Sequence, residues 1–487
     1  MNISKNTKIV CTIGPSSDNY ETCKELYKAG MNIMRCNFSH GTYEEHLNKL
    51  NIAERLEKED GILIPVMLDT KGPEIRTGNF EGGEATIKMN SIVKISMEEI
   101  MGNAELFSVN YSGLYDDIKV GHQIKLDDGN LTLEVIEKDN ANKLIICRAL
   151  NTHTVKDRRG VNCPDTEIKM DYISQKDYED IKWGCTQRFS FIAASFVRNA
   201  SDVLSIRKLL DENGRPDIKI ISKIENPIAV KNIDEIIKVT DAIMVARGDL
   251  GVEIPAEEVP IVQKQLIAKC IESGIPVITA TQMLDSMKTN PNPTRAEVSD
   301  VANAVMESTD SVMLSAESAN GEYPVLAAAT QAKISSRMEK YLDYGTLAKE
   351  AFKNLKKSNE KNVNSAMAVS VVQTAVLTDT KLIFAFSSSP DTAKLISKAR
   401  PCCPILFVTD NRSEALTACL NWGVYPVLIP RIPQFIEEME VIALLQSRKL
   451  GLTPGSKVII TGGVPTGAAN TNFMKIISVI QPRELDI

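Results

Sequence analysis

Short apolar runs alternate with amphipathic stretches along much of the chain, beginning at residue 7. The run KIVCTIG precedes a helical pattern that ends near Gly30, and MNIMRCN precedes another over residues 42–58. Runs that are apolar throughout are typical of strands buried on both faces, as in parallel sheets covered by helices. The alternation therefore predicts repeated units in which one strand is followed by one helix.

This alternation stops between residues 73 and 170. Short β-like segments such as SIVKISM and LTLEVIEK follow one another there, separated by turn residues, and no helical pattern of ordinary length is evident. Regularly spaced short strands with turn signals indicate an all-β unit. We expect a small β-barrel domain inserted after the third strand.

The alternation of strands and helices resumes after residue 170 and continues to residue 341. Ser174 and Thr294 are each followed three residues later by an acidic residue, which is typical of the first turn of a helix. Each apolar run paired with its helix gives eight units in all, the third interrupted by the β insertion. Eight such units predict an α/β fold, a closed (β/α)8 barrel of residues 1–72 and 171–341. The alternative is an open doubly wound sheet, which would gather its polar residues at one crevice.

A lysine-rich stretch from about residue 342 to 362 precedes another α/β pattern. Residues 342–487 have the length of an ordinary domain, and we expect them to form one. In it, SSSPDT at residues 387–392 lies between a predicted strand and a predicted helix, where hydroxyl and N–H groups can hold a phosphate. A simple helix N-cap explains the same letters equally well. TGGVPTGAAN, residues 461–470, is a second glycine-rich loop.

Composition excludes several classes of protein. The net charge of −7 argues against binding to nucleic acid, which needs a basic surface. Neither a signal peptide nor a run of about 18 apolar residues is present, so we expect a cytoplasmic protein without membrane contact. The 10 cysteines form no C-x-x-C pair, and the 4 histidines have no zinc-binding spacing.

Polar side chains follow most of the predicted barrel strands, and the carboxyl ends of such strands build the active sites of these barrels. Glu225 and Asp249 provide carboxylates and Lys223 an ammonium group, which together predict an oxygen site for Mg²⁺ beside a cation. For any one of these residues, a solvated strand exit is the alternative. The residues at these ends, polar except for Gly248, are Arg35, Asn37, Ser39, His40, Asp69, Thr70, Lys71, Ser195, Lys223, Glu225, Arg247, Gly248, Asp249, Thr281, Gln282, Ser315 and Glu317.

Several long segments that contain these residues resemble the pyruvate kinase family, and they occur in the family's order over nearly the whole chain. They are KIVCTIGPSS, NIMRCNFSHGT, LDTKGPEIRTG, ISKIEN, MVARGDLGVEIP, ITATQMLDSM, PTRAEVSDVANAV and MLSAESANGEYP. The resemblance implies a (β/α)8 barrel, a β lid inserted after its third strand and a C-terminal α/β effector domain. It also implies transfer of the phosphoryl group of phosphoenolpyruvate to ADP, which gives pyruvate and ATP in the last step of glycolysis.

The resemblance further implies roles for individual residues in the barrel. Lys223, Arg35 and Thr281 would be catalytic: Lys223 would stabilise the phosphoryl group in flight, and Arg35 would hold the phosphate. The N–H groups of Gly248 and Asp249, with the Thr281 hydroxyl, would hold the substrate carboxylate. The remaining implied sites are Mg²⁺ or Mn²⁺ at Glu225 and Asp249, K⁺ at Asn37, Ser39, Asp69 and the Thr70 carbonyl, and the nucleotide at Asn37, Ser39, His40, Arg76 and Arg159.

Four further features refine what the resemblance implies. Glu74 matches the form of the motif associated with K⁺ dependence. Residues 127–129 resemble the turn that closes over the nucleotide, and an ordinary hairpin turn is the alternative for the same letters. Arg159 stands where lysine is common. In the effector loop, Ser387, Ser388, Ser389 and Thr392 would hold a phosphorylated effector. Relatives often have Thr-x-Ser-Gly-x-Thr there, whereas Pro390 lacks an N–H and Asp391 adds negative charge, so the effector stays open.

The resemblance also implies a homotetramer. Two other functions compete with a kinase: a Mg²⁺-dependent lyase acting on phosphoenolpyruvate or a pyruvate enolate, and a metabolite sensor without catalysis. A lyase needs neither a lid nor a nucleotide site, so the β insertion and the TKGPEIRTG run argue against it. A sensor would not need Lys223, Glu225 and Asp249, all of which are present.

Overall fold

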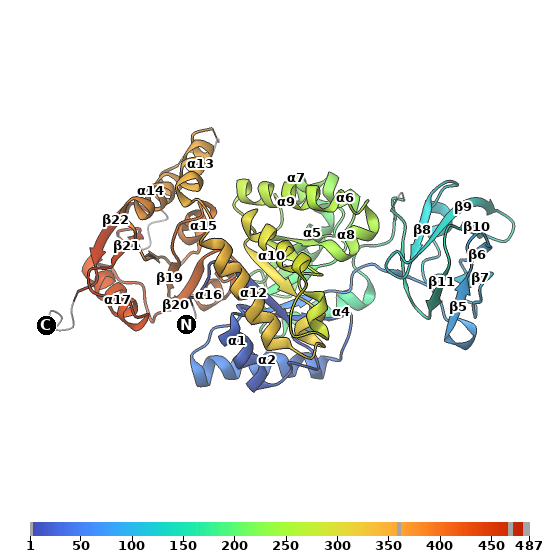
Figure 1. Ribbon diagram of the computed structural model, residues 1–487, viewed down its shortest axis with the longest axis horizontal. Coiled ribbons are helices and arrows are strands. Elements are labelled where there is room, and N and C mark those ends of the chain that lie inside the picture. The colour runs from blue at the N-terminus through green and yellow to red at the C-terminus, as the bar shows by residue number, and fades with distance from the viewer. Residues whose placement is uncertain (1–2, 165, 358–361, 466–470, 481–487) are drawn as a thin grey trace.

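A computed structural model describes residues 3–164, 166–357, 362–465 and 471–480. The chain forms three parts in a row, with a barrel in the middle, an all-β lid on one side and a C-terminal α/β part on the other (Figure 1). Of the glycine-rich stretch 461–470, residues 466–470 lie outside the described residues. No helix in the described part of the chain is both long and apolar enough to cross a membrane.

The central part is a closed barrel of parallel strands in the order β1-β17-β16-β15-β14-β13-β3-β2. The closed α/β barrel expected from the count of βα units is thereby confirmed, and the open sheet is excluded. Its strands are β1 (Lys8–Thr12), β2 (Ile33–Asn37), β3 (Val66–Asp69), β13 (Phe191–Ala194), β14 (Lys219–Ile224), β15 (Ala242–Ala246), β16 (Val277–Ala280) and β17 (Ser311–Leu314).

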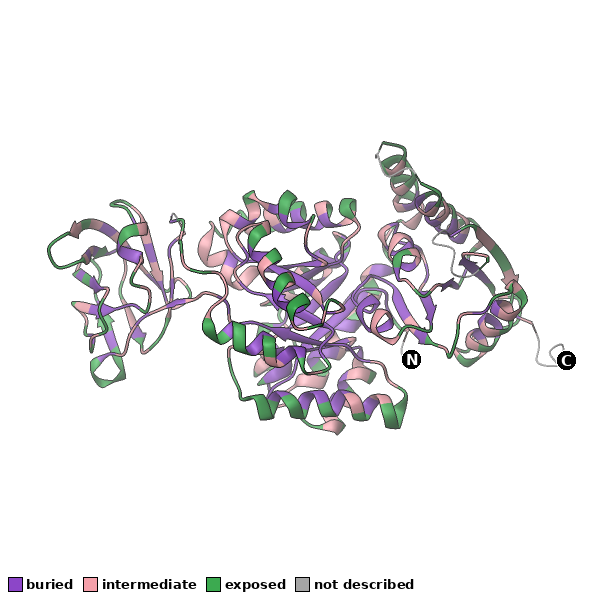
Figure 2. Cartoon of the chain, turned by 180° about the vertical axis from the view of Figure 1, so that it is seen from behind, coloured by how far each residue is buried: buried purple, intermediate pink, exposed green. Residues whose placement is uncertain are grey.

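Helices cover the outside of the barrel, and their apolar faces pack on strands that are buried almost throughout (Figure 2). Asn19, Thr42, Ser174, Asn199 and Thr294 cap helices there by accepting backbone N–H hydrogen bonds. The helices are α1 (Tyr20–Ala29), α2 (Tyr43–Asp60), α4 (Gln175–Cys185), α5 (Ala200–Glu212), α6 (Pro227–Lys231), α7 (Ile233–Ile236), α8 (Arg247–Glu253), α9 (Val259–Ser273), α10 (Arg295–Met306), α11 (Ala316–Ala319) and α12 (Pro324–Glu339), with a 3₁₀ turn at Asp285–Lys288.

The lid is a sheet in the order β4-β12-β8-β9-β10-β6-β7, with a second pair, β11-β5, beside it. An isolated bridge between Thr77 and Val109 joins the continuations of the two edge strands, β4 and β7. Its elements are β4 (Ile75–Arg76), β5 (Glu84–Ile87), β6 (Ile92–Ser96), β7 (Leu106–Ser108), α3 (Leu114–Asp117), β8 (Gln123–Leu126), β9 (Leu131–Asp139), β10 (Leu144–Ala149), β11 (His153–Lys156) and β12 (Gly160–Asn162), with a 3₁₀ turn at Glu81–Gly83.

The C-terminal part is a sheet in the order β20-β19-β18-β21-β22, with helices packed on it. Four of these strands are parallel, and β22 pairs antiparallel with β21. Its elements are α13 (Tyr344–Lys357), α14 (Val363–Thr378), β18 (Leu382–Phe386), α15 (Asp391–Lys398), β19 (Ile405–Thr409), α16 (Arg412–Ala418), β20 (Val424–Leu428), α17 (Ile436–Lys449), β21 (Lys457–Gly462) and β22 (Phe473–Ser478).

A buried ion pair joins the C-terminal part to the bottom of the barrel. Arg400 Nη1 lies 3.0 Å from Asp310 Oδ1, and both side chains are almost fully buried. Asp310 also accepts hydrogen bonds from the backbone N–H groups of Val277 and Trp422. Leu420 packs within the apolar interior of the barrel. The amino ends of β16 and β17 are thus tied to the C-terminal part.

Candidate active site

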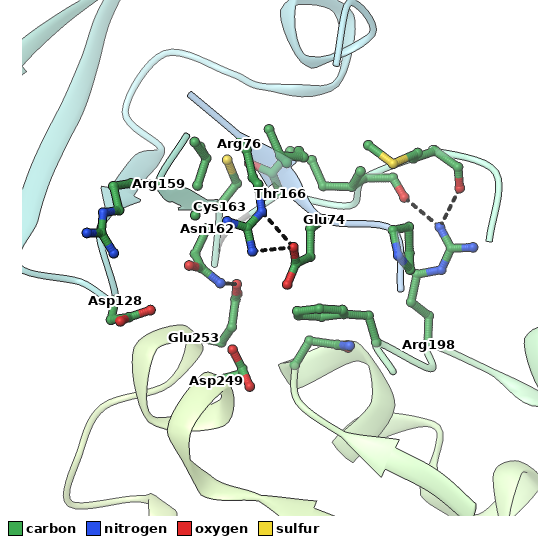
Figure 3. A pocket seen from close by; sticks show the side chains of 18 of the residues that line it. Glu74, Arg76, Asp128, Arg159, Asn162, Cys163, Thr166, Arg198, Asp249 and Glu253 are labelled. Carbon is green, nitrogen blue, oxygen red and sulfur yellow. Dashed lines mark hydrogen bonds and ion pairs between the residues drawn. The ribbon is translucent and has the colours of Figure 1, made fainter. Parts of the chain in front are cut away.

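A cavity of about 310 Å³ lies between the carboxyl ends of the barrel strands and the lid. We call it the cleft. Figure 3 shows Arg76, Arg159 and Asn162 of the lid on one side and Asp249 and Glu253 of α8 on the other. The two walls come from segments far apart in sequence because the lid leaves the barrel after β3 and returns before α4. The cleft is therefore an interdomain site.

Lys223 lies near the carboxyl end of β14 and is largely buried. Its Nζ is 2.9 Å from Glu225 Oε1 and 3.2 Å from Asp69 Oδ1, and it donates a hydrogen bond to Ser195 Oγ at 2.7 Å. Burial opposes the positive charge, but the two carboxylates outweigh it and raise the pKa of Lys223. A charged ammonium is thus held where β3, β13 and β14 end.

Asp69 orients a second cation from the neighbouring strand. Arg35 Nε donates to Asp69 Oδ2 at 2.6 Å, and Arg35 Nη1 donates to Thr12 Oγ1 at 2.8 Å. Burial disfavours ionised Asp69, but the charges of Arg35 and Lys223 outweigh burial and lower the pKa of Asp69. One buried carboxylate therefore fixes two cations side by side, which suits an anionic group that must be held in one orientation.

Two further carboxylates lack a comparable excess of positive charge. Glu225 is fully buried, and burial, opposed by Lys223 and assisted by Asp249, raises its pKa to about 7. Burial likewise raises the pKa of Asp249, opposed by Lys223 and assisted by Glu74 and Asp128. A divalent cation would offset both the burial of these two carboxylates and the repulsion from neighbouring carboxylates. Among the described residues, no group of three or more His, Cys, Asp or Glu side chains could hold a metal ion, so ligand oxygens would have to complete its shell.

Thr281 follows β16 in a strained conformation. Its φ is +69°, and that of Gln282 is +54°, backbone angles that residues other than glycine rarely adopt. Arg247 holds this turn, since its guanidinium donates to the carbonyls of Thr281 at 2.6 Å and Ala280 at 3.3 Å. The N–H of Gly248 donates to Thr281 Oγ1 at 2.7 Å. The strain places the hydroxyl against the start of α8, in keeping with strain stored at functional sites.

Two arginines from the lid side line the cleft. Arg76 Nε and Nη2 each lie 2.7 Å from Glu74 Oε2. Arg159 Nε lies 3.5 Å from Asp127 Oδ1. Asp127 and Asp128 both have positive φ, at +53° and +55°, so the chain turns sharply there and brings both acids to the cleft wall. Each of these two arginines is therefore paired with a carboxylate on the lid side.

The structure brings most of the predicted site residues together. Asn37 and Ser39 lie at and just after the end of β2 and belong to neither of the two groups given below, and Ser39 N donates to Asn37 Oδ1 at 3.1 Å. The carbonyl of Thr70 accepts a hydrogen bond from Ser195 Oγ at 2.6 Å. The contacting group is Arg35, Asp69, Ser195, Lys223 and Glu225, and the cleft-lining group is His40, Glu74, Arg76, Asp127, Asp128, Arg159 and Asp249.

Sequence reasoning missed several residues of the cleft. Arg198 is the clearest case, because its Nη1 donates to the carbonyls of Ile168 at 3.1 Å and Met170 at 2.9 Å, where the lid returns to the barrel. Its position just after β13 was a usable signal, since the other site residues also follow strands. The missed cleft residues include Asn162, Cys163, Thr166, Phe196, Arg198 and Glu253.

The SSSPDT loop lies in the C-terminal part, away from the cleft (Figure 1). Ser388 Oγ donates to Asp410 Oδ1 at 2.9 Å, and Ser389 Oγ donates to Asp391 Oδ2 at 2.7 Å. α15 begins at Asp391. Two hydroxyl groups of the loop thus already have carboxylate partners, which an anion would have to displace.

Comparison with known proteins gives consistent matches over almost the whole chain. A family model described as "Pyruvate kinase, barrel domain" matches residues 4–328, and one described as "Pyruvate kinase, alpha/beta domain" matches residues 365–477. Pyruvate kinase of Geobacillus stearothermophilus is 46% identical over 476 residues, which cover 97% of this chain and 80% of that protein. Pyruvate kinase of Lactobacillus delbrueckii subsp. bulgaricus is 46% identical over 475 residues, with the same coverage.

A solved structure also resembles this fold. The crystal structure of a pyruvate kinase from Cryptosporidium parvum superposes with a TM-score of 0.92 at 37% sequence identity. The match covers 98% of this chain and 96% of that one. Fold and sequence comparisons therefore point to one family.

Proposed function

This chain belongs to the pyruvate kinase family, and from that premise we propose which of its residues carry out phosphoryl transfer from phosphoenolpyruvate to ADP. The products are pyruvate and ATP. The observation that carries the assignment is the buried ammonium of Lys223 between Asp69 and Glu225, beside an interdomain cleft. The lyase and the sensor find no support in the comparisons.

We assign the phosphate of phosphoenolpyruvate to Arg35 and Lys223. Phosphoryl transfer depends mainly on positioning and on neutralising charge on the transferred group. Arg35 is oriented by Asp69 and Thr12, so it is ready to hold the phosphate. Lys223 stabilises the charge on the group in flight because its ammonium is fixed in a site that excludes most water.

The substrate carboxylate and the proton route fall to the turn at Thr281. The N–H groups of Gly248 and Asp249 and the Thr281 hydroxyl hold the carboxylate in this proposal. The hydrogen bond from Gly248 N to Thr281 Oγ1 supports it, because the N–H group and the hydroxyl lie close enough together to contact one carboxylate. The enolate left after transfer must be protonated at carbon, and a hydroxyl is a poor acid unaided. A water relay through Thr281 therefore supplies that proton.

Pyruvate kinases are generally metal-dependent. We propose Mg²⁺, or Mn²⁺ in its place, at Glu225 and Asp249, whose raised pKa values fit a site short of positive charge. Such a cation supplies neutralisation of the phosphate oxygens. K⁺ is proposed at the oxygens of Asn37, Ser39, Asp69 and the Thr70 carbonyl; Asn37 and Asp69 are paired in register on β2 and β3.

ADP occupies the cleft in this proposal. Its contacts are assigned to Asn37, Ser39, His40, Arg76 and Arg159, of which the last three line the cleft. The arginines can neutralise diphosphate oxygens, although each now has a carboxylate partner. Nucleotide binding would therefore exchange these internal pairs for contacts with phosphate.

We also propose the larger organisation of the protein. The domains are residues 1–72 with 171–341, 73–170, and 342–487, and the assembly is a cytoplasmic homotetramer. A phosphorylated effector binds at Ser387, Ser388, Ser389 and Thr392. The hydroxyls of this loop support an anion site, whereas the carboxylates of Asp391 and Asp410 restrict it to effectors that can displace them.

Binding of Mn²⁺ tests the metal assignment directly. Glu225→Gln and Asp249→Asn should each weaken Mn²⁺ binding by at least tenfold, measured by electron paramagnetic resonance with phosphoenolpyruvate present. Asp128→Asn is the matched control, since Asp128 is a cleft carboxylate outside the proposed shell. Unchanged Mn²⁺ affinity in both substituted proteins would refute the assignment.

A separate experiment tests the effector loop. Initial rates at low phosphoenolpyruvate are compared with and without fructose 1,6-bisphosphate, ribose 5-phosphate, glucose 6-phosphate or AMP. We expect one of them to lower the half-saturating concentration of phosphoenolpyruvate, and Ser388→Ala with Ser389→Ala to abolish that response. Catalysis insensitive to all four would contradict the effector assignment while leaving the barrel assignment intact.

A further inference from the structure

The lid touches the last turn of α8 through two hydrogen bonds. Lys125 Nζ, at the end of β8, donates to the carbonyl of Val252 at 2.6 Å. Asn162 Nδ2, at the end of β12, donates to Glu253 Oε1 at 2.7 Å. The lid turn also approaches closely, since a Cβ added to Gly129 would lie 3.5 Å from Val252 Cγ1. Two separate segments of the lid, β8 with the turn that follows it and β12, thus converge on one helical turn.

The acceptors on α8 suit this contact. Val252 lies in the last turn of the helix, where carbonyl groups lack partners within the helix. An ammonium group satisfies such a carbonyl and also complements the negative end of the helix. Both hydrogen bonds are partly buried, so their loss would leave polar groups poorly solvated. The lid and α8 are therefore joined by specific hydrogen bonds as well as by van der Waals contact.

α8 also carries one of the residues proposed to act on substrate. Asp249 lies four residues before Glu253, about one helical turn away. The start of the helix is held by Gly248 N on Thr281 Oγ1 at 2.7 Å and by Arg247 Nη1 on Asp300 Oδ1 at 2.6 Å. Figure 3 shows Asn162 of the lid above Glu253, with Asp249 beside it. A shift of the lid would therefore act on a helix that is fixed at its other end.

We propose that Lys125 and Asn162 form a latch that holds the lid on the last turn of α8 and so sets the distance between the two walls of the cleft. This inference rests on the proposed function, because it takes the cleft as the nucleotide site. Lys125 and Asn162 are positioning residues: they act by keeping Arg76 and Arg159 opposite Asp249. Phosphoenolpyruvate contacts are assigned to the barrel alone. Loss of the latch should therefore raise the KM for ADP and leave the affinity for phosphoenolpyruvate unchanged.

Lys125→Met tests the latch against a matched control, Lys138→Met. Lys138 Nζ also donates to a backbone carbonyl, that of Ile118 at 2.9 Å, but within the lid. Loss of a hydrogen bond from a charged group corresponds to roughly a tenfold change. We expect Lys125→Met to raise the KM for ADP about tenfold while leaving the calorimetric affinity for phosphoenolpyruvate unchanged. Lys138→Met should leave both as in the wild type.

A double-mutant cycle tests the second contact. Asn162→Ala and Glu253→Ala should each raise the KM for ADP, and the double variant should be no worse than the more affected single variant. Effects that multiply independently would show that the two residues act separately on the nucleotide and would overturn the latch. An equal rise in the dissociation constant for phosphoenolpyruvate in Lys125→Met would overturn it as well.

Small-angle X-ray scattering of the full chain without substrates separates this inference from the proposed function. The scattering curve of Lys125→Met should depart from the wild-type curve as the lid moves, and that of Lys138→Met should superpose on it. Identical curves for wild type and Lys125→Met would overturn the latch even if the enzyme is active. Absence of turnover in the wild type would instead refute the proposed function, and scattering would still decide the latch.

Discussion

Replacing Lys223 by methionine should slow phosphoryl transfer about a thousandfold while weakening phosphoenolpyruvate binding far less. The ammonium lies 2.9 Å from Glu225 and 3.2 Å from Asp69, so it is held at a fixed point. A unit charge about 4 Å from a developing negative charge contributes roughly 4 kcal/mol at an effective dielectric constant of about 20. That energy corresponds to about a thousandfold in rate. Methionine keeps an unbranched apolar chain, one atom shorter than that of lysine, but removes the charge.

The same change should also destabilise the barrel. It leaves two buried carboxylates without their shared cation, and breaking a buried ion pair typically costs about 3 to 5 kcal/mol. Glu225 can reduce this cost by taking up a proton, because its pKa is already about 7. Lys24→Met is the control, since Lys24 pairs with Asp60 at 2.6 Å on the outside of the barrel. We expect that variant to keep its activity and nearly all its stability.

Two measurements separate rate from binding. Rapid-quench experiments with saturating substrates give the rate of the chemical step, and calorimetry with phosphoenolpyruvate alone gives its dissociation constant. Lys223 is assigned to the transition state, so the rate should fall and the dissociation constant should change by less than about tenfold. A dissociation constant that rises as much as kcat/KM falls would refute this role, as would a rate within tenfold of the wild type.

Three further predictions concern other parts of the molecule. Glu74→Lys should remove the requirement for K⁺, measured as initial rates with tetramethylammonium replacing K⁺; a persisting requirement would contradict the link between Glu74 and K⁺ dependence. Arg400→Met should lower stability by about 3 kcal/mol, because it leaves Asp310 buried without its partner; calorimetry showing an unchanged melting temperature would exclude this. Burial of Glu297 is outweighed by hydrogen bonds from Ser286 and from the N-cap of α10, so its pKa is lowered in the folded protein. Its stabilisation is complete above the ordinary pKa of about 4.3 and is lost as the pH falls through the lowered value. Glu297→Gln should therefore cost about 1 kcal/mol of unfolding free energy at neutral pH and less in acid, and an equal cost at both would refute the reasoning.

Much of the fold and of the barrel site could be predicted because parallel strands bring their carboxyl ends together. Arg35, Asp69 and Lys223 are far apart in sequence, yet each follows or ends an apolar run, and the structure places them in contact. Their position relative to the strand was enough to predict that they meet. The count of eight strands followed from the same pattern.

Other features could not be predicted because no local pattern encodes them. α8 begins directly after β15, and ARGDLGVE contains two glycines, which are poor helix formers, so tertiary packing decides its conformation. The contact between Asn162 and Glu253 spans 91 residues and depends on how the lid sits on the barrel. β22 is likewise added to its sheet only by pairing with β21, and no strand was predicted after the glycine-rich stretch 461–470.

The most direct test of the central claim is the initial rate of pyruvate formation from phosphoenolpyruvate and ADP. It is measured with Mg²⁺ and K⁺ together and then with each replaced, Mg²⁺ by no divalent cation and K⁺ by tetramethylammonium. The assignment of phosphoryl transfer to the carboxyl ends of the barrel strands predicts rapid turnover that requires Mg²⁺ and is strongly reduced without K⁺. Absence of turnover under every condition, in protein shown to be folded, would contradict it.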